Sequence, residues 1–178
     1  MDLARLYADI GAQGPLPPVE RWHPPFCGDI DMRITHDGTW LYNGTPIQRP
    51  AMVRLFAGIL RREGDAYFLV TPVEKVGITV EDVPFIAVEM TVESGGLTFR
   101  TNVDDVVTAD TDHPLRFETD GDSFRPYICV RNGLEARLSH SLARDLAALG
   151  EIREYENEAW FGVCSGALFF PVVQADHL

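Results

Sequence analysis

The sequence predicts an α+β fold built from two structurally similar, β-rich halves, each with a helix packed on antiparallel strands. One observation is the predicted order of elements in residues 27–84: a strand, a turn, a strand, a helix and a strand. Residues 115–173 show a less clear copy of the same order. Another is the turn chemistry, because an Asp-Gly step precedes an Asn-Gly step in both segments and such steps favour hairpins. The two Asn-Gly steps are 89 residues apart and the two predicted helices 90. This self-similarity indicates a duplication.

Residues 1–26 are predicted to precede the two halves as a helix and a strap. Asp2 suits the N-cap of a short amphipathic helix, whose apolar residues at spacings of three and four are Leu3, Leu6, Tyr7 and Ile10. Residues 14–26 contain five prolines, which exclude a helix there. We expect this proline-rich strap to pack Trp22 and Phe26 against the core.

The first half, residues 27–80, contains the clearest helix of the chain, over residues 50–63. Pro50 fits the first helical turn, where its missing N–H is not needed, and Gly64 fits the helix end. We expect the helix to bury an apolar stripe made of Met52, Leu55, Phe56, Ile59 and Leu60. Strands are predicted at residues 30–34, 40–42, 67–70 and 76–80.

The second half, residues 81–178, consists mainly of predicted strands. Alternating apolar residues indicate a strand over residues 86–92, and Gly95-Gly96 a hairpin into residues 97–101. A helix over residues 139–149 ends at Gly150. The remaining strands are predicted at residues 115–118, 127–131, 160–164 and 167–173.

The charge distribution argues against nucleic acid as a partner. The 178 residues carry a formal charge of −12, and 18 of the 27 acidic residues follow residue 77, where only seven basic residues offset them. Because an acidic surface repels polyphosphates, we expect no nucleic-acid binding. In residues 27–77, six bases balance six acids, so this segment can hold a small anion locally.

Membrane insertion and a cofactor are likewise not expected. No apolar run approaches the roughly 18 residues of a membrane helix, and the N-terminus lacks the apolar core of a signal peptide, which predicts a cytoplasmic protein. Cys27, Cys129 and Cys164 are far apart and suggest neither a disulfide framework nor a zinc site. We expect them to be buried free thiols.

The predicted ligand site combines basic and aromatic residues. Lys75 is the single lysine beside fourteen arginines, which makes it a candidate phosphate or carboxylate contact, with a solvent-facing strand residue as the alternative. Arg49 lies at the start of the predicted helix, where first-turn amides and the helix dipole favour an anion. The predicted site, at a seam between the halves, consists of Arg49, Arg54, Lys75 and Arg116 for the anion, with Trp22 and Tyr42 to stack on a base.

Two acidic groups are candidates for metal binding, although simpler roles are favoured. Asp29 and Asp31 share one face of a predicted strand, so their carboxylates suit a metal or a shared proton, with pairing to Arg33 or Arg49 as the alternative. A second group lacks the spacing of a calcium loop and is expected to be a solvated loop: Asp104, Asp105, Asp110, Asp112 and His113.

Four motifs are distinctive in combination: GDIDMRI at residues 28–34, DGTWLY at 37–42, GTPI at 44–47 and TPVEKV at 71–76. With them the chain resembles, over nearly its whole length, a proteobacterial family known as domain of unknown function 1285. The resemblance implies a duplicated α+β core, a C-terminal half like a pleckstrin-homology barrel, and a nucleotide-type ligand between the domains of a signalling protein. The family has no established activity, so it supplies no site residues.

These observations favour a non-catalytic module that binds a small anionic, nucleotide-type ligand in signalling or regulation. One alternative is a metal-dependent hydrolase or transferase that uses Asp29 and Asp31. Another is a protein-interaction module, since barrels of the pleckstrin-homology shape often bind peptides. No catalytic constellation is recognisable in the sequence, so the question of enzyme activity stays open, with a preference for none.

Overall fold

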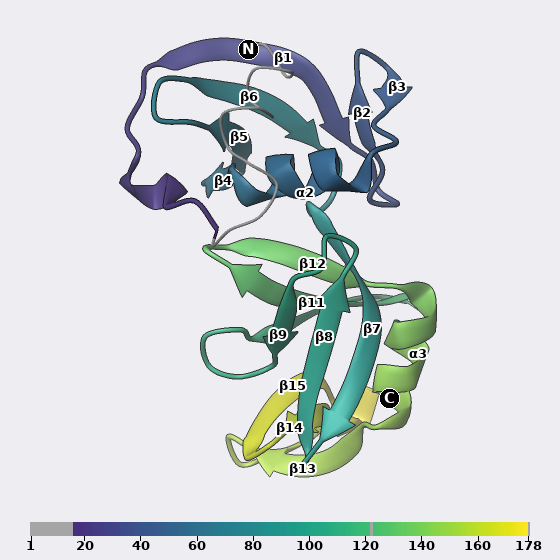
Figure 1. Ribbon diagram of the computed structural model, residues 1–178. Coiled ribbons are helices and arrows are strands. Elements are labelled where there is room, and N and C mark those ends of the chain that lie inside the picture. The colour runs from purple at the N-terminus through teal and green to yellow at the C-terminus, as the bar shows by residue number, and fades with distance from the viewer. Residues whose placement is uncertain (1–15, 122, 178) are drawn as a thin grey trace. The chain divides into compact units, whose positions relative to one another are not determined.

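The computed structural model describes residues 16–121 and 123–177, and the chain divides into two units between Pro84 and Phe85 (Figure 1). This division lies four residues beyond the expected boundary between residues 80 and 81. The helix predicted near the N-terminus lies outside the described residues. Among those described, no helix is long and apolar enough to cross a membrane.

The first unit is a six-stranded mixed sheet with one α-helix. In spatial order its strands are β3, β2, β1, β6, β5 and β4. Neighbours are antiparallel except for the central pair, β1 and β6, which is parallel. The elements are η1 (Val19–Arg21), β1 (Phe26–Ile34), β2 (Trp40–Tyr42), β3 (Thr45–Pro46), α2 (Pro50–Gly58), β4 (Leu60–Glu63), β5 (Ala66–Val70) and β6 (Lys75–Val80).

Helix α2 is shorter than predicted. It begins at Pro50, as expected, but ends at Gly58, and the chain continues as β4 from Leu60. Ile59 has already left helical geometry, and its carbonyl accepts a hydrogen bond from the backbone N–H of Val70 at 2.9 Å. Pairing between β4 and β5 therefore ends the helix, and the apolar spacing that suggested a longer helix belongs to two elements.

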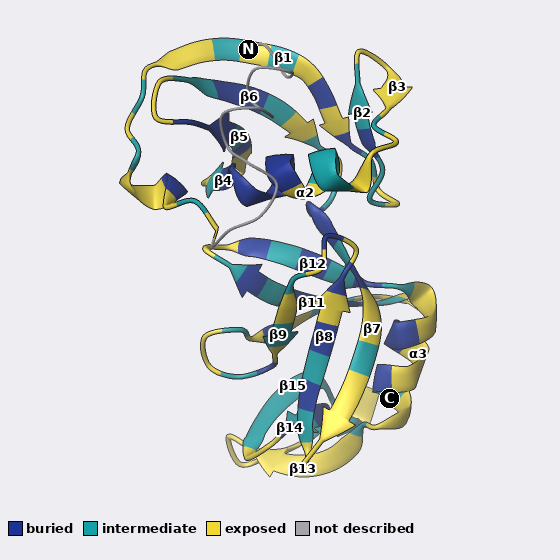
Figure 2. Ribbon diagram, in the orientation of Figure 1, coloured by how far each residue is buried: buried dark blue, intermediate teal, exposed yellow. Residues whose placement is uncertain are grey.

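The apolar stripe predicted for this helix is largely buried. Phe56 is fully buried and stacks on Trp40 of β2, with ring centroids 6.4 Å apart. The stripe residues Leu55, Ile59 and Leu60 are buried too, whereas Met52 at the helix start is half-buried. Figure 2 shows the end of α2 in the colour of buried residues.

A buried arginine holds the proline-rich strap. Arg61 is only 7% exposed, and its Nη1 donates hydrogen bonds to the carbonyl oxygens of Val19 at 3.0 Å and Trp22 at 2.8 Å. Val19 is buried and Trp22 half-buried, but Phe26 is 55% exposed and belongs to β1. The expectation that Phe26 packs against the core was therefore wrong.

The second unit repeats the six-stranded sheet and adds a smaller one. Its strands lie in the order β10, β11, β12, β7, β8 and β9, again with one parallel pair, β12 and β7. A three-stranded antiparallel sheet of β13, β14 and β15 follows α3. The elements are β7 (Phe85–Glu93), β8 (Gly96–Thr101), β9 (Val106–Thr108), β10 (Leu115–Asp120), β11 (Ser123–Arg131), β12 (Leu134–Leu138), α3 (His140–Ala148), β13 (Glu151–Tyr155), β14 (Glu158–Ser165), β15 (Leu168–Gln174) and η2 (Ala175–His177).

The duplication is confirmed, but its register differs from the one predicted. When β7–β12 take the places of β1–β6, the spatial order is the same, and the parallel pair joins the first and last strands of each set of six. The predicted repeat instead matched residues 27–84 to residues 115–173. Those two segments share an order of three strands, a helix and three strands, but in the second segment the strands before and after the helix join different sheets.

Three further expectations are corrected. Each six-stranded sheet is mixed, although only antiparallel strands were predicted. None of the three sheets in the described part of the chain is closed, so the pleckstrin-homology-like barrel implied for residues 81–178 is not formed by these strands. None of the three cysteines forms a disulfide with a described residue, as expected, but none is buried, since Cys27 is exposed and Cys129 and Cys164 are half-buried.

Candidate functional site

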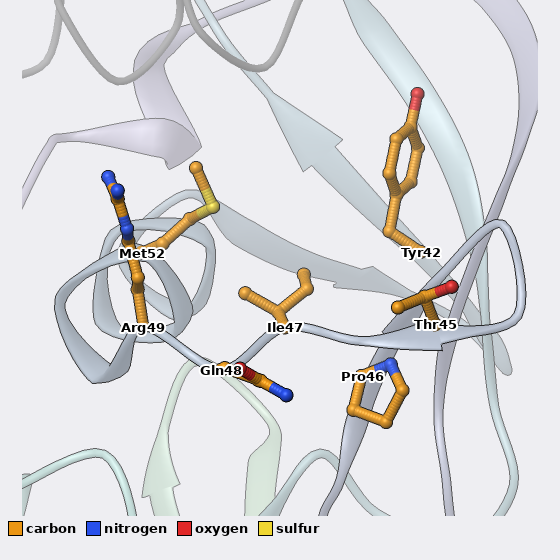
Figure 3. A pocket seen from close by; sticks show the side chains of 7 residues that line it. All are labelled: Tyr42, Thr45, Pro46, Ile47, Gln48, Arg49 and Met52. Atoms are coloured by element: carbon orange, nitrogen blue, oxygen red, sulfur yellow. The ribbon is translucent and has the colours of Figure 1, made fainter.

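The first unit contains a cleft where the β2–β3 hairpin meets the start of α2. Its volume is about 270 Å³, and it is lined by Tyr42, Thr45, Pro46, Ile47, Gln48, Arg49 and Met52. Figure 3 shows Pro46 and Gln48 pointing to one side of the segment between the hairpin and the helix, and Ile47, Arg49, Met52 and Tyr42 pointing to the other.

A tight turn forms one wall of this cleft. Asn43 and Gly44 have positive φ values of 48° and 75°, the combination that a two-residue hairpin turn requires. The turn places Thr45 opposite Tyr42 in the antiparallel pairing of β2 and β3. Tyr42 also lies opposite Met32, a buried residue of β1, so its ring is on the same face of the sheet as part of the core.

The other wall is the start of α2. Arg49 is the N-cap, with an extended backbone, and Pro50 follows at the first helical position. The carbonyl oxygen of Arg49 accepts hydrogen bonds from the amides of Met52 at 3.0 Å and Val53 at 3.2 Å. Fewer first-turn amides are therefore available to an anion than the sequence suggested, and the Arg49 side chain is the main positive group of the cleft.

Arg49 differs from four other basic residues of this unit in having no acidic partner among the described residues. Carboxylates lie within 4 Å of Arg33, Arg61, Arg62 and Lys75. Among the residues that the structure describes, the exposed Arg49 side chain makes neither an ion pair nor a hydrogen bond, and the same holds for the hydroxyl of Tyr42. Neither group would therefore have to break a side-chain contact with a described residue in order to contact a ligand.

Lys75 lies at the opposite end of β1 from this cleft. Phe26 at the start of β1 pairs with Lys75, and Met32 pairs with Tyr42, a separation of six residues or about 20 Å along the strand. The ammonium of Lys75 is 3.1 Å from Oε2 of Glu63. The hydrogen bond from Lys75, with a smaller contribution from Arg61, lowers the pKa of Glu63. Lys75 is therefore outside the cleft and already paired with a carboxylate of its own unit.

Arg116, in the second unit, is also engaged within the protein. Its Nε donates to Oε1 of Glu135 at 2.9 Å and its Nη1 to Oε1 of Glu118 at 2.6 Å, while its guanidinium lies 4.0 Å from the ring centroid of Tyr127. The hydrogen bond to Glu135 is the largest cause that raises the pKa of Arg116, and the hydrogen bond from Arg116 lowers the pKa of Glu118.

The two remaining predicted site residues do not line the cleft. Trp22 lies in the strap, where its carbonyl accepts the hydrogen bond from Arg61. Arg54 is an exposed residue of α2. Of the six predicted ligand contacts, the cleft therefore brings together Arg49 and Tyr42.

The acidic candidates do not assemble into a metal site in the part of the chain described. Asp29 and Asp31 are both exposed on β1, and no group of three His, Cys, Asp or Glu side chains suited to a metal ion occurs among residues 16–121 and 123–177. Asp29 lies opposite Gly77 of β6, where an added Cβ would stand 2.0 Å from the carboxylate oxygen Oδ1. Because glycine has no side chain, position 77 leaves room for the carboxylate of Asp29.

The acidic tract of residues 104–113 is tied down by its own surroundings. Asp105 pairs with Arg131. Asp110 accepts the backbone N–H groups of Asp112 at 2.9 Å and His113 at 2.8 Å, and the bond from His113 is the main cause of its lowered pKa. The tract contains turns and the short strand β9. Asp104 and Asp112 are exposed, as expected of a solvated segment, whereas Asp105 and Asp110 are held by contacts within the protein.

Sequence reasoning missed most of the apolar lining of the cleft. Met52 was assigned to the core, and Ile47 was noted only within a motif of the family resemblance. The sequence feature that could have located the cleft is Gly44 followed by a short extended segment and Pro50. A tight hairpin directly before a helix leaves a corner between the two elements. The depth of that corner depends on side chains from both elements.

The fold and the cleft define a small, domain-duplicated β-rich protein with an open cleft in its first unit. The chain belongs to the DUF1285 family: residues 17–83 match the domain of unknown function (DUF1285), N-terminal domain, and residues 84–172 match the protein of unknown function (DUF1285), C-terminal domain. No curated protein matches the chain.

Two solved structures of DUF1285 family proteins are similar to this chain. The protein from Silicibacter pomeroyi DSS-3 is 47% identical, with a TM-score of 0.88, and the similarity covers 99% of this chain and 97% of that one. The protein from Shewanella baltica OS155 is 28% identical, with a TM-score of 0.56, over 66% of this chain and 90% of that one. Neither description states a ligand or an activity.

Proposed function

We propose that this protein is a non-catalytic regulatory module that binds a small anionic ligand in the cleft of its first unit. The observation that carries the proposal is the Arg49 guanidinium, which has no protein partner among the described residues and lies in a cleft with Ile47, Met52 and Tyr42. A guanidinium binds carboxylate or phosphate through two parallel hydrogen bonds. The apolar side chains and the tyrosine ring suit the uncharged part of the same ligand.

The size and charge of the cleft limit the ligand. A volume of about 270 Å³ is just below the usual range for small-molecule sites, which starts at roughly 300 Å³. One arginine in the lining suits a single anionic group better than a triphosphate. A nucleotide-type ligand, as the family resemblance implied, would place one phosphate at Arg49 and its base against Tyr42.

Calorimetry tests this proposal with a series of small anions, such as benzoate, isovalerate, AMP and ATP, up to millimolar concentrations. Arg49→Ala should weaken binding about tenfold to a hundredfold, because a charge-assisted hydrogen bond contributes about 1.5–3 kcal/mol. Arg49→Lys, which keeps the charge but loses the paired donors, should recover part of the affinity.

Lys75→Ala is the matched control, since it removes the same charge outside the cleft and is expected to leave binding unchanged. Lys75 was also a predicted ligand contact, so the control decides between two sites. Equal losses in the two alanine variants, or no binding of any anion at millimolar concentration, would contradict the proposed cleft.

A further inference from the structure

The three sheets in the described part of the chain have six edge strands, and most of these edges are protected. Exposed edges invite pairing with another chain, and proteins limit this with short strands, prolines, irregular pairing or a covering segment. Strand β3 has two residues and ends in Pro46, and β9 has three residues. The strap covers β4 through Arg61, while β15 contains Pro171 and contacts β10.

Strand β13 has none of these protections from residues 16–121 or 123–177. Its five residues pair with β14 in an unbroken register, and every one of them is exposed. Figure 2 shows the whole strand in the colour of exposed residues. Two large apolar side chains are included, Ile152 at 58% and Tyr155 at 37% exposure, and Leu149 just before the strand is 46% exposed. The Tyr155 ring also contacts Trp160 and Phe169, so Ile152 is the most exposed apolar group on this regular edge.

The β13–β14 hairpin is also acidic. Glu151 pairs with Arg153 at 2.7 Å, so these two charges largely offset each other. Glu154 on β13 and Glu156 in the turn are exposed, and neither has an ion-pair partner among the described residues. A strand that docks on this edge therefore meets uncompensated negative charge.

We propose that β13 is a docking strand that binds an extended, basic segment of another protein by β-strand addition. Backbone hydrogen bonds along the edge would supply affinity, and alternate side chains would supply selectivity. Ile152 and Glu154 share one face of the strand, so the segment should carry an apolar and a basic residue two positions apart.

Charge argues against a second copy of this chain as the occupant. Antiparallel self-pairing that uses all five residues of β13 is centred on Arg153 and places that arginine opposite its own copy. Like charges directly opposite each other destabilise a strand pair. Each copy also carries a formal net charge of −12, so a basic partner fits the edge better than the protein itself.

Titration with designed heptapeptides, followed by backbone amide NMR of the full chain, tests this. The probes are a peptide that alternates lysine and valine, the same peptide with glutamate for lysine, and the lysine peptide with proline at its centre. The lysine peptide should bind saturably and shift the amides of residues 151–155. The glutamate and proline peptides should bind at least about tenfold more weakly, because they remove the charge match and the strand pairing respectively.

Glu154→Lys should lower the affinity for the lysine peptide about tenfold and raise the affinity for the glutamate peptide. Glu93→Lys is the matched control, because it makes the same charge change at an exposed residue of β7, which is not an edge strand. Glu93→Lys should leave the affinities for both peptides within about twofold of those of the wild-type protein.

Several results would overturn the proposal. These are the absence of saturable binding by the lysine peptide, equal binding of the proline peptide, and amide shifts confined to the acidic tract of residues 104–113. Equal effects of the two charge reversals would also overturn it, because they would indicate attraction to net charge alone. A concentration-dependent dimer in sedimentation that Glu154→Lys changes would identify a second copy as the occupant instead.

Discussion

The two units build the same sheet but cover it with a helix from different points of the chain. In the first unit α2 lies between β3 and β4. In the second unit β9 and β10 are joined without a helix, and α3 follows the last strand, β12, and packs on β7, β11 and β12. What the duplication retains is the strand order around a parallel central pair. A sheet requires a covered apolar face, and that cover can come from any part of the chain that reaches it.

The two helices also begin in different ways. Ser139 caps α3, with its hydroxyl oxygen accepting a hydrogen bond from the N–H of Leu142 at 3.4 Å. Helix α2 has no side-chain cap and relies on Pro50 at its first position. Arg49, at this uncapped start, lines the cleft, so the cleft and the less regular helix start occur in the same unit.

The largest effect should come from removing the buried anchor of each helix. Phe56 and Leu146 are both fully buried. Phe56→Ala should lower the free energy of unfolding by about 3–5 kcal/mol and Leu146→Ala by about 2–5 kcal/mol, because each leaves a cavity. Urea denaturation measures both losses, with Arg144→Ala on the exposed side of α3 as a control within about 0.5 kcal/mol. If only one anchor variant is costly, the two helices do not cover their sheets in equivalent ways.

The next largest effect should come from removing Arg61, which holds the strap in the first unit by hydrogen bonds. Arg61→Ala should cost about 2–3 kcal/mol, since the carbonyls of Val19 and Trp22 lose a charged donor. Hydrogen exchange should speed up at residues 19–22. Arg62→Ala removes a neighbouring arginine with local contacts only, a hydrogen bond to the carbonyl oxygen of Gly64 at 2.8 Å and an ion pair at 3.7 Å with the fully exposed Asp65. It should cost less than about 1 kcal/mol. Unchanged exchange in Arg61→Ala would show that the strap is held by other contacts.

A smaller difference is expected between two strand glycines. In the second unit, a Cβ on Gly162 would lie 2.4 Å from the backbone oxygen of Phe170, which cannot move without disturbing β15, so Gly162→Ala should cost about 1–3 kcal/mol. In the first unit, a Cβ on Gly77 comes closest to the carboxylate of Asp29, which can rotate away.

Gly77→Ala should therefore cost less than about 1 kcal/mol, and adding Asp29→Ala should remove that cost. Thermal or urea unfolding of the three variants measures this. A Gly77→Ala loss as large as that of Gly162→Ala, and not relieved by the second change, would show that the backbone at Gly77 is itself constrained.

The smallest effect concerns pH and is tested on one carboxylate of each unit that a base holds. Lys75 lowers the pKa of Glu63, and Arg116 lowers that of Glu118, in both cases below the usual 4.5. A lowered pKa in the folded state contributes stability that is complete above the unfolded value and is lost as the pH falls through the folded one. Glu63→Gln and Glu118→Gln should each reduce the loss of stability between about pH 5 and about pH 3. An unchanged pH profile in either variant would show that its ion pair contributes no measurable stability.

Much of the fold follows from local sequence. Asn-Gly steps favour positive φ at two successive residues, so Asn43-Gly44 and Asn132-Gly133 predicted tight turns that the structure contains. Pro50 marked the start of α2, and the apolar spacing identified Phe56 as a core residue. These features depend on the conformational preferences of a few neighbouring residues, which act wherever the segment lies in the fold.

Long-range pairing decided the rest. The end of α2 at Gly58, the burial of Arg61 and the true register of the duplication all depend on strands that meet from distant parts of the chain. Parallel pairing of β1 with β6 carries no turn signal, because the strands are joined by a long crossover. The cleft likewise exists only where a hairpin and a helix start come together, so Arg49 and Tyr42 could be named from the sequence, but their shared cleft with Ile47 and Met52 is a product of tertiary structure.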